Sequence, residues 1–206
     1  MSSITQYRMA PHVRRAAVLC ALLLIQTDAS AGMPERHGVL PARMSVSTVR
    51  YTIPAVKLIR DDGVDVSLPQ ELNDGRPVMV NFIFTSCGSI CPLMSQVFGQ
   101  VQRRLGADGS NLHLLSISTD PEEDTPARLR EYAQKFGARA GWNHYTGTLE
   151  ASQSAQRAFG VYRGDKMSHT PVTLIRAVPA GPWLRIEGFA TPDELLRQYH
   201  QLLATR

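Results

Sequence analysis

The sequence contains few cysteines and no long hydrophobic run, and each shortage excludes a class of protein. Only three of its 206 residues are cysteine, too few for a small fold held together by several disulfides. The longest apolar run, 16–25, is about half of the roughly 20 residues that a membrane-spanning helix needs. A protein anchored by a transmembrane helix is therefore the weaker interpretation.

Charge of one sign and aromatic side chains are also scarce. The formal net charge is +4, the basic residues are scattered along the chain, and aromatic residues make up 7%. Nucleic-acid binding typically needs a clustered basic surface with aromatic side chains for stacking, and the sequence has neither. We therefore expect no nucleic-acid partner. With 43% hydrophobic residues the chain can bury one ordinary core, which predicts one compact domain.

The first 31 residues have the pattern of a secretory signal peptide. Arg8, Arg14 and Arg15 precede the apolar run, and the small-residue segment 29–31 follows it. A basic start, a short apolar centre and a small-residue cleavage site together define such signals. We predict cleavage after Ala31 and a periplasmic or otherwise extracytoplasmic location, with membrane association only if the segment stays uncleaved.

Two cysteines remain once the signal peptide is removed. Cys20 lies within the predicted signal, which leaves Cys87 and Cys91 in a compartment that favours disulfides. With no other cysteine available, these two either pair with each other, bind something, or stay reactive. The sequence alone leaves the three possibilities open.

The rest of the chain divides into a tether and a domain. Residues 32–50 carry Gly, Pro, Ser and Arg without a period, which predicts a flexible tether. In residues 51–206, strand-like and helix-like hydrophobic periods alternate. This order predicts an α/β, thioredoxin-like fold, with a central mixed β-sheet flanked by helices and an N-terminal β-hairpin. The expected elements are a hairpin over 56–68, strands over 78–84, 112–118, 172–175 and 183–189, and helices over 92–105, 129–136, 149–159 and 191–203.

The cysteine pair lies where a buried strand gives way to a helix. If that helix begins near Cys91, its free backbone N–H groups and its dipole favour thiolate over thiol at both sulfurs. On a continuous helical path, the spacing of Cys87 and Cys91 puts the two side chains on one face, roughly 5 to 6 Å apart at Cβ. This geometry can hold a metal ion or close a disulfide.

A metal site needs a further ligand, and His169 is the best placed of the six histidines. It precedes Pro171 and a predicted strand whose entry loop lies against the cysteine loop in a thioredoxin-like sheet. We expect His113 to lie in a strand, either packed or facing the surface, His144 to form hydrogen bonds in a loop, and His200 to face solvent. By position alone, His169 is more often structural than a ligand.

Three ordered motifs resemble the Sco/SenC family of copper chaperones for cytochrome c oxidase. They are the pattern FxFTxCxxxCP, the segment STDPEEDTP at 118–126, and a histidine just ahead of a strand. The resemblance covers roughly residues 50–203. It implies that Cys87 and Cys91 bind copper through sulfur and that His169 is the third ligand. It further implies assembly of the binuclear copper centre of oxidase subunit II, with an upstream copper donor as a second candidate partner.

Two segments depart from the family pattern. The spacer 88–90 is Gly-Ser-Ile, where family members usually carry an acidic residue, so the loop is less anionic. Met167 and Ser168 precede His169, where the family usually has Tyr-x-Val-Asp-His. Met167 can offer a soft thioether or simply pack. In the middle motif, Asp120 makes a turn near the thiols, and we give the individual carboxylates a structural role.

An alternative function from the enzyme class remains open. Thioredoxin-like reductases place a cis-proline facing the dithiol, and Pro171 lies close to that position. The alternative is a thiol:disulfide oxidoreductase that reduces the cysteines of the copper-centre apoprotein. In that role Cys87 attacks, Cys91 resolves the mixed disulfide, and His169 is dispensable. The motifs favour a metallochaperone over an enzyme.

Overall fold

The computed structural model describes residues 44–106 and 111–205. The predicted signal peptide and most of the predicted tether lie outside these residues. The described residues belong to one compact unit, Val39–Arg206. Its elements are β1 (Ser45–Val49), β2 (Lys57–Arg60), β3 (Asp65–Ser67), α1 (Leu68–Leu72), β4 (Val78–Ile83), α2 (Ile90–Leu105), β5 (His113–Ser118), α3 (Pro126–Lys135), β6 (Trp142–Thr146), α4 (Leu149–Ala158), β7 (Val172–Arg176), β8 (Trp183–Glu187) and α5 (Pro192–Ala204).

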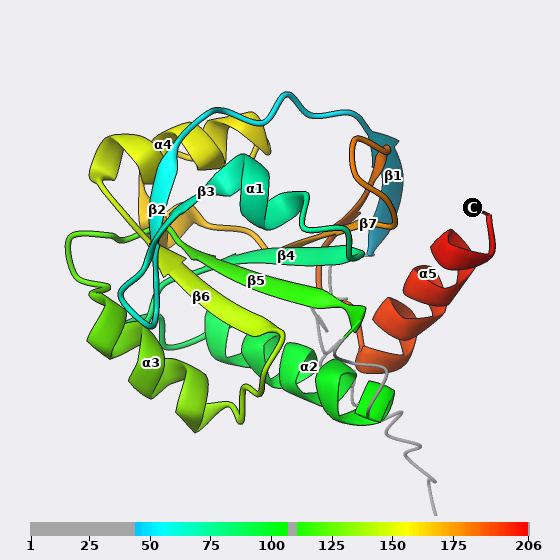
Figure 1. Cartoon of the computed structure of the whole chain (residues 1–206). Coiled ribbons are helices and arrows are strands. Elements are labelled where there is room, and N and C mark those ends of the chain that lie inside the picture. Colours follow the sequence, from blue (N-terminus) through cyan, green and yellow to red (C-terminus); the bar gives the residue numbers. More distant parts are fainter. Residues whose placement is uncertain (1–43, 107–110, 206) are drawn as a thin grey trace, which may run out of the picture. The chain divides into compact units, whose positions relative to one another are not determined.

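One mixed sheet runs through the domain (Figure 1). In the part of the chain that the structure describes, eight strands pair in the order β1-β8-β7-β4-β5-β6-β2-β3. Strands β4, β5 and β6 are parallel, whereas β7 pairs antiparallel with both β4 and β8. Parallel neighbours need a crossover, and α2 and α3 provide the two crossovers of this parallel trio. The predicted α/β, thioredoxin-like fold with a mixed sheet is confirmed.

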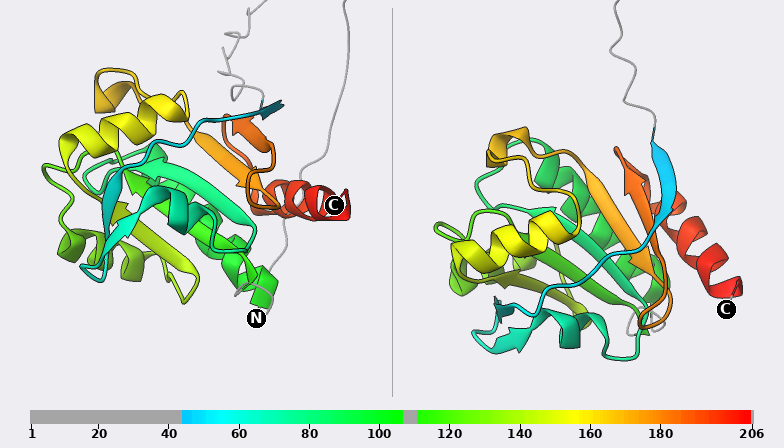
Figure 2. Two further views of the ribbon diagram at one scale, coloured as in Figure 1. Left: turned by 45° about the horizontal axis from the view of Figure 1, so that its top comes forward. Right: turned by 90° about the horizontal axis from the view of Figure 1, so that it is seen from above.

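Helices cover both faces of the sheet, and each face has its own core (Figure 2). Apolar side chains of α2, α3 and α5 form one buried cluster, and those of α1 and α4 help to form the other. Strand β4 contributes to both clusters, because its alternate side chains point to opposite faces and all six are buried. The near-continuous apolar run that predicted this strand follows from that double burial.

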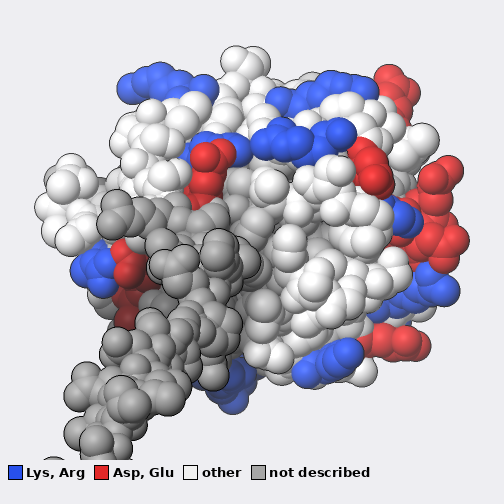
Figure 3. All heavy atoms as spheres, turned by 180° about the vertical axis from the view of Figure 1, so that it is seen from behind, with Lys and Arg blue, Asp and Glu red and all other residues white. Residues whose placement is uncertain are grey.

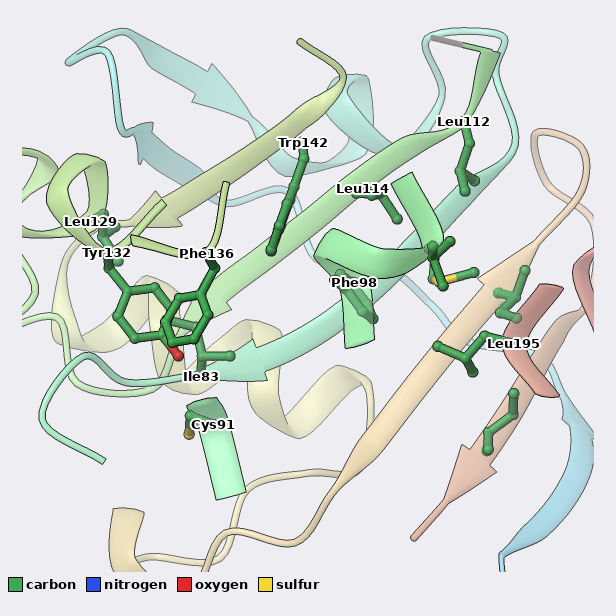
Figure 4. Close-up of a cluster of buried hydrophobic side chains, with 14 of the residues drawn as sticks. Ile83, Cys91, Phe98, Leu112, Leu114, Leu129, Tyr132, Phe136, Trp142 and Leu195 are labelled. Carbon is green, nitrogen blue, oxygen red and sulfur yellow. The ribbon is translucent and has the colours of Figure 1, made fainter. Parts of the chain in front are cut away.

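Helix α2 packs closely against the segment that ends α3. A side chain at Gly99 would place its Cβ 2.7 Å from the carbonyl oxygen of Phe136, so only glycine fits. The helix ends at Gly106, whose φ of 56° is in the left-handed region. Figure 4 shows the cluster to which this helix contributes, with Phe98 near its middle and Cys91 at its lower edge. The helix predicted over 92–105 is confirmed.

The hairpin and the last helix also form as predicted. Strands β2 and β3 pair antiparallel, with Leu58 opposite Val66 and Gly63 in the turn at φ 88°. The hydroxyl of Thr191 accepts a hydrogen bond from the backbone N–H of Glu194, so it caps α5 as its sequence indicates. None of the helices in the described residues is both long and apolar enough to cross a membrane.

The tether prediction is wrong at its C-terminal end. Residues Ser45–Val49 form strand β1, which pairs with β8 so that Val46 lies opposite Ile186. Four of the five β1 residues are exposed, because an edge strand is held by its backbone hydrogen bonds more than by buried side chains. Its hydrophobic pattern is therefore weak, and composition alone predicted a tether.

Strand β6 was not predicted, and the expectation that His144 lies in a loop is wrong. His144 is fully buried in β6 and pairs in register with Ser116 of β5. Its ring lies 5.1 Å from the ring of Trp142 and 6.1 Å from that of Tyr132. Strand β6 was missed because it contains polar residues and no aliphatic run. Its buried histidine packs against aromatic rings instead.

Candidate dithiol and metal site

The two cysteines lie together at the junction of β4 and α2. Cys87 follows the end of β4, and its N–H donates to the carbonyl of Phe84 in a tight turn. Cys91 is in the first turn of α2, and its N–H donates to the sulfur of Cys87 at an N–S distance of 3.4 Å. Both thiols are free and buried, with exposed fractions of 9% for Cys87 and 0% for Cys91. The predicted placement of the pair is confirmed.

The two thiols have opposite acid strengths. Burial opposes ionisation of Cys87, but N–H groups of Cys91, Ser89 and Ile90 donate to its sulfur and lower its pKa on balance. Burial raises the pKa of Cys91 well above its ordinary value, and the neighbouring Cys87 sulfur and the Asp124 carboxylate add to this effect. Cys87 is therefore the more acidic thiol of the pair, and Cys91 is the less acidic one.

Asp124 fixes the loop that carries the cysteines. Its fully buried carboxylate accepts hydrogen bonds from the N–H of Thr85 at 3.2 Å, the hydroxyl of Thr85 at 2.5 Å and the hydroxyl of Ser118 at 2.6 Å. Asp120, by contrast, forms an ion pair with Lys166 at 2.5 Å. Sequence reasoning missed Asp124, although it lies within the 118–126 motif, where only Asp120 was considered as a neighbour of the thiols.

His169 lies beside the end of β4. Its Nε2 is 2.9 Å from the carbonyl oxygen of Phe82, and antiparallel pairing of β4 with β7 brings the two segments together. Because a carbonyl only accepts, Nε2 carries the hydrogen and Nδ1 carries the lone pair. Burial lowers the pKa of His169, so the ring is neutral at neutral pH. A neutral imidazole is the form that binds metals.

The three predicted ligands are only partly brought together. Cys87 and Cys91 are in contact, but among residues 44–106 and 111–205 no three Cys, His, Asp or Glu side chains form a ready metal site. His169 instead lines a cavity of about 370 Å³, together with Asp120, Lys166 and other residues, and neither cysteine lines that cavity. Thiolate and imidazole are donors that suit copper, so the donor set fits the metal chemically.

The remaining described histidines lie away from the cysteines. His113 is buried at the start of β5, where Nε2 lies 3.0 Å from the hydroxyl of Tyr145 and Nδ1 lies 3.0 Å from Asp74. His200 is exposed on α5. The predictions that His113 lies in a strand and that His200 faces solvent are confirmed. Figure 3 shows both signs of charge scattered over the face that it draws, so no strong field of one sign dominates there.

Solved structures share this fold. BsSco, described as a member of the Sco family of cytochrome c oxidase assembly proteins, has a TM-score of 0.63 at 23% identity, covering 78% of this chain and 98% of that one. The ScoI protein of Bradyrhizobium japonicum, solved with copper bound, has a TM-score of 0.61 at 23% identity, covering 74% of this chain and all of that one. At these identities, the likeness establishes the fold.

Sequence comparison identifies the family. A protein of Stutzerimonas stutzeri, whose name proposes copper binding, is 30% identical over 149 residues, which are 70% of this chain and 67% of that protein. The SCO1 homologue of Bacillus subtilis is 32% identical over 100 residues, and the match spans about half of its length. The SCO1/SenC family model matches residues 51–177, more than half of the sequence. The chain therefore belongs to the SCO1/SenC family.

Proposed function

We propose that this protein is an extracytoplasmic copper-binding chaperone that assists assembly of the binuclear copper centre of cytochrome c oxidase subunit II. The observation that carries the proposal is the free thiol pair at the start of α2, with the Cys91 N–H donating to the Cys87 sulfur. Family membership supports copper as the cargo, because one relative is named for copper and BsSco is described as an oxidase assembly protein.

The donor set favours copper(I) over harder metals. The lowered pKa of Cys87 favours its thiolate form, which is the soft anionic ligand that copper(I) prefers. His169 would bind through Nδ1, because the Phe82 carbonyl holds the N–H at Nε2. Metal-bound histidines commonly donate their second nitrogen to a backbone carbonyl in this way. Cys91 would lose its proton when copper binds.

The cellular setting belongs to the same proposal. A predicted signal peptide over 1–31 places the domain outside the cytoplasm, where subunit II would receive copper. An upstream copper donor would load the protein first. The neutral Gly-Ser-Ile spacer at 88–90 leaves Cys87 as the principal negative charge of the cysteine loop.

The test is an anaerobic copper(I) titration of the reduced protein against a competing chelator. We expect about one copper per wild-type domain and none retained by Cys87→Ser, because two thiolates are the core of the site. His169→Ala should weaken affinity by at least about tenfold, whereas His200→Ala, which removes an exposed histidine from α5, should not. Unchanged binding by His169→Ala would remove His169 from the site and leave a two-sulfur ligand set.

A second function, thiol:disulfide exchange, has one specific observation in its favour. The two thiols are unequal, with the pKa of Cys87 lowered and that of Cys91 raised. A thiolate at Cys87 would attack a target disulfide, form the mixed disulfide and release one target thiolate. Cys91, once deprotonated, would attack the Cys87 sulfur, close the Cys87–Cys91 disulfide and release the second target thiolate. The protein is oxidised by two electrons and the target is reduced.

Trapping separates this function from the first. Cys91→Ser cannot resolve the mixed disulfide, so it should accumulate an adduct with an oxidised peptide of the subunit II copper site. His169→Ala should form and resolve the adduct as fast as wild type, because histidine takes no part in the exchange. Failure of Cys91→Ser to form an adduct at Cys87 would exclude the reductase function.

A further inference from the structure

Met167 is the most exposed of the large apolar side chains in the described residues. Its exposed fraction is 72%, compared with 50% for Leu93, the next highest. It therefore contributes little to any core, and packing does not account for it. The thioether is a soft ligand that copper(I) accepts. A second group that can bind a metal, the imidazole of His169, lies two residues further along the chain.

The turn that carries Met167 is tied on both sides to the segment that leads to the cysteines. Lys166 forms its ion pair with Asp120, and its ammonium lies 5.9 Å from the ring centroid of Phe84. On the other side of Met167, His169 contacts the carbonyl of Phe82. The side chain of Met167 is thus left in solvent between two anchored neighbours.

The backbone of this turn is also fixed. Lys166–Ser168 forms a single 3-10 turn, and the carboxylate of Asp165 accepts a hydrogen bond from the N–H of Met167 at 2.9 Å. The N–H of His169 donates to the carbonyl of Lys166 at 3.2 Å. The exposed side chain therefore projects from an ordered turn, and local hydrogen bonds fix the backbone of Met167 relative to that of His169.

We propose that Met167 is an entry ligand, which takes copper(I) from its donor and passes it to Cys87, Cys91 and His169. This inference rests on the proposed copper function and deepens it. The step is a ligand exchange in which copper stays in the +1 state. The thioether displaces a donor ligand, the Cys87 thiolate and the Cys91 sulfur then displace the thioether, and the Cys91 proton goes to water. No oxidant or reductant takes part.

The probe is the coloured copper(I)–bicinchoninate complex, mixed rapidly with excess reduced apoprotein under anaerobic conditions. Met167→Leu keeps the apolar volume of the side chain and removes only the sulfur. We expect this variant to take up copper about tenfold more slowly than wild type, with unchanged final stoichiometry. Met79→Leu is the matched control, since it removes a thioether that is fully buried in β4, and its rate should equal that of wild type.

A second variant pair tests ligation without the cysteines. The Cys87→Ser, Cys91→Ser double variant should still bind copper(I) weakly and transiently through Met167 and His169, and adding Met167→Leu should abolish that binding. The possible failures differ. Equal uptake rates in wild type and Met167→Leu would overturn the role of the Met167 sulfur as an entry ligand and would leave the proposed copper function standing. No copper uptake by wild type would overturn the proposed function and this inference together.

Discussion

The two ends of β4 carry similar residue types but organise them in opposite ways. At the cysteine end, the carboxylate of Asp124 holds the loop of Cys87, and backbone N–H groups near the start of α2 lower the pKa of Cys87. At the other end, beside the start of β4, His113 lies among Asp74, Tyr145 and Glu71. The first end contains a thiol of lowered pKa, whereas the second places a buried histidine close to two carboxylates and a hydroxyl.

The difference shows which polar groups are free for chemistry. Both ring nitrogens of His113 face polar side chains, since Asp74 lies 3.0 Å from Nδ1 and the Tyr145 hydroxyl lies 3.0 Å from Nε2. His169 has one nitrogen against the carbonyl of Phe82 and lines a cavity with its exposed edge. Burial alone therefore does not distinguish the two histidines, and His169 differs from His113 in lying beside a cavity, which is why we propose His169 rather than His113 as a ligand.

The largest expected effect comes from removing the carboxylate that holds the cysteine loop. Asp124→Ala would leave the buried donors of Thr85 and Ser118 without an acceptor, so we expect a loss of about 3 kcal/mol in the free energy of unfolding. Urea denaturation measures this difference directly. If Asp74→Ala lowered the free energy of unfolding by the same amount, the carboxylates at the two ends of β4 would be equally important for stability.

Asp74 is the matched control at the other end. Its side chain is 27% exposed and its main partner is Arg76, so water replaces its contacts when it is removed. We expect Asp74→Ala to cost no more than about 1 kcal/mol, in the range of partly exposed ion pairs. A loss above that of Asp124→Ala would contradict the assignment of Asp124 as the buried anchor of the cysteine loop.

The next largest effect concerns the different reactivities of Cys87 and Cys91. With iodoacetamide at neutral pH, Cys87 should alkylate at least about tenfold faster than Cys91, because thiolate is the nucleophile. As pH rises, the rate at Cys87 should reach its plateau below the range of an ordinary thiol, while Cys91 should stay slow throughout. Peptide mass mapping of partly alkylated protein gives both rates.

Single-cysteine variants are the control, because alkylation of one thiol can change the reactivity of the other. Cys91→Ser keeps the backbone N–H that donates to the Cys87 sulfur, so Cys87 should stay fast. Cys87→Ser should leave Cys91 slow, since Cys91 is fully buried. Equal rates at the two sulfurs would mean that the start of α2 does not distinguish them.

Local sequence predicted the elements whose side chains decide their structure. Strand β4 has an apolar run because both of its faces are buried, whereas α2 repeats its apolar residues at helical spacing because only one of its faces is buried. The placement of Cys87 between these two elements followed directly. Strand β1 escaped prediction because it is held by backbone pairing with β8, which its own side chains do not encode.

The sequence names the residues of the candidate site, but it does not predict their contacts. The motifs identified Cys87, Cys91 and His169, but no local pattern shows that His169 contacts Phe82, 87 residues earlier in the chain. The role of Asp124 depends on Thr85, which is 39 residues away. Such contacts are set by the pairing of β4 with its neighbours, and only the assembled sheet brings them together.

The smallest effect concerns stability at low pH and belongs to the His113 end. Burial lowers the pKa of His113, with nearby Arg76 acting in the same direction against Asp74 and Glu71. The unfolded chain therefore takes up this proton at a higher pH than the folded protein, so stability is full above about pH 6.5 and falls as the pH drops. We expect the free energy of unfolding to decline between pH 7 and pH 5. Buried His169, whose pKa is also lowered, contributes to this decline with the same sign.

His113→Gln should flatten this decline by at most about 1.4 kcal/mol per pH unit, whereas His200→Gln should leave the slope unchanged. An unaltered slope in His113→Gln would mean that the acidic neighbours of His113 compensate for its burial. Of these two histidines, only His169 would then contribute to the pH dependence of the free energy of unfolding.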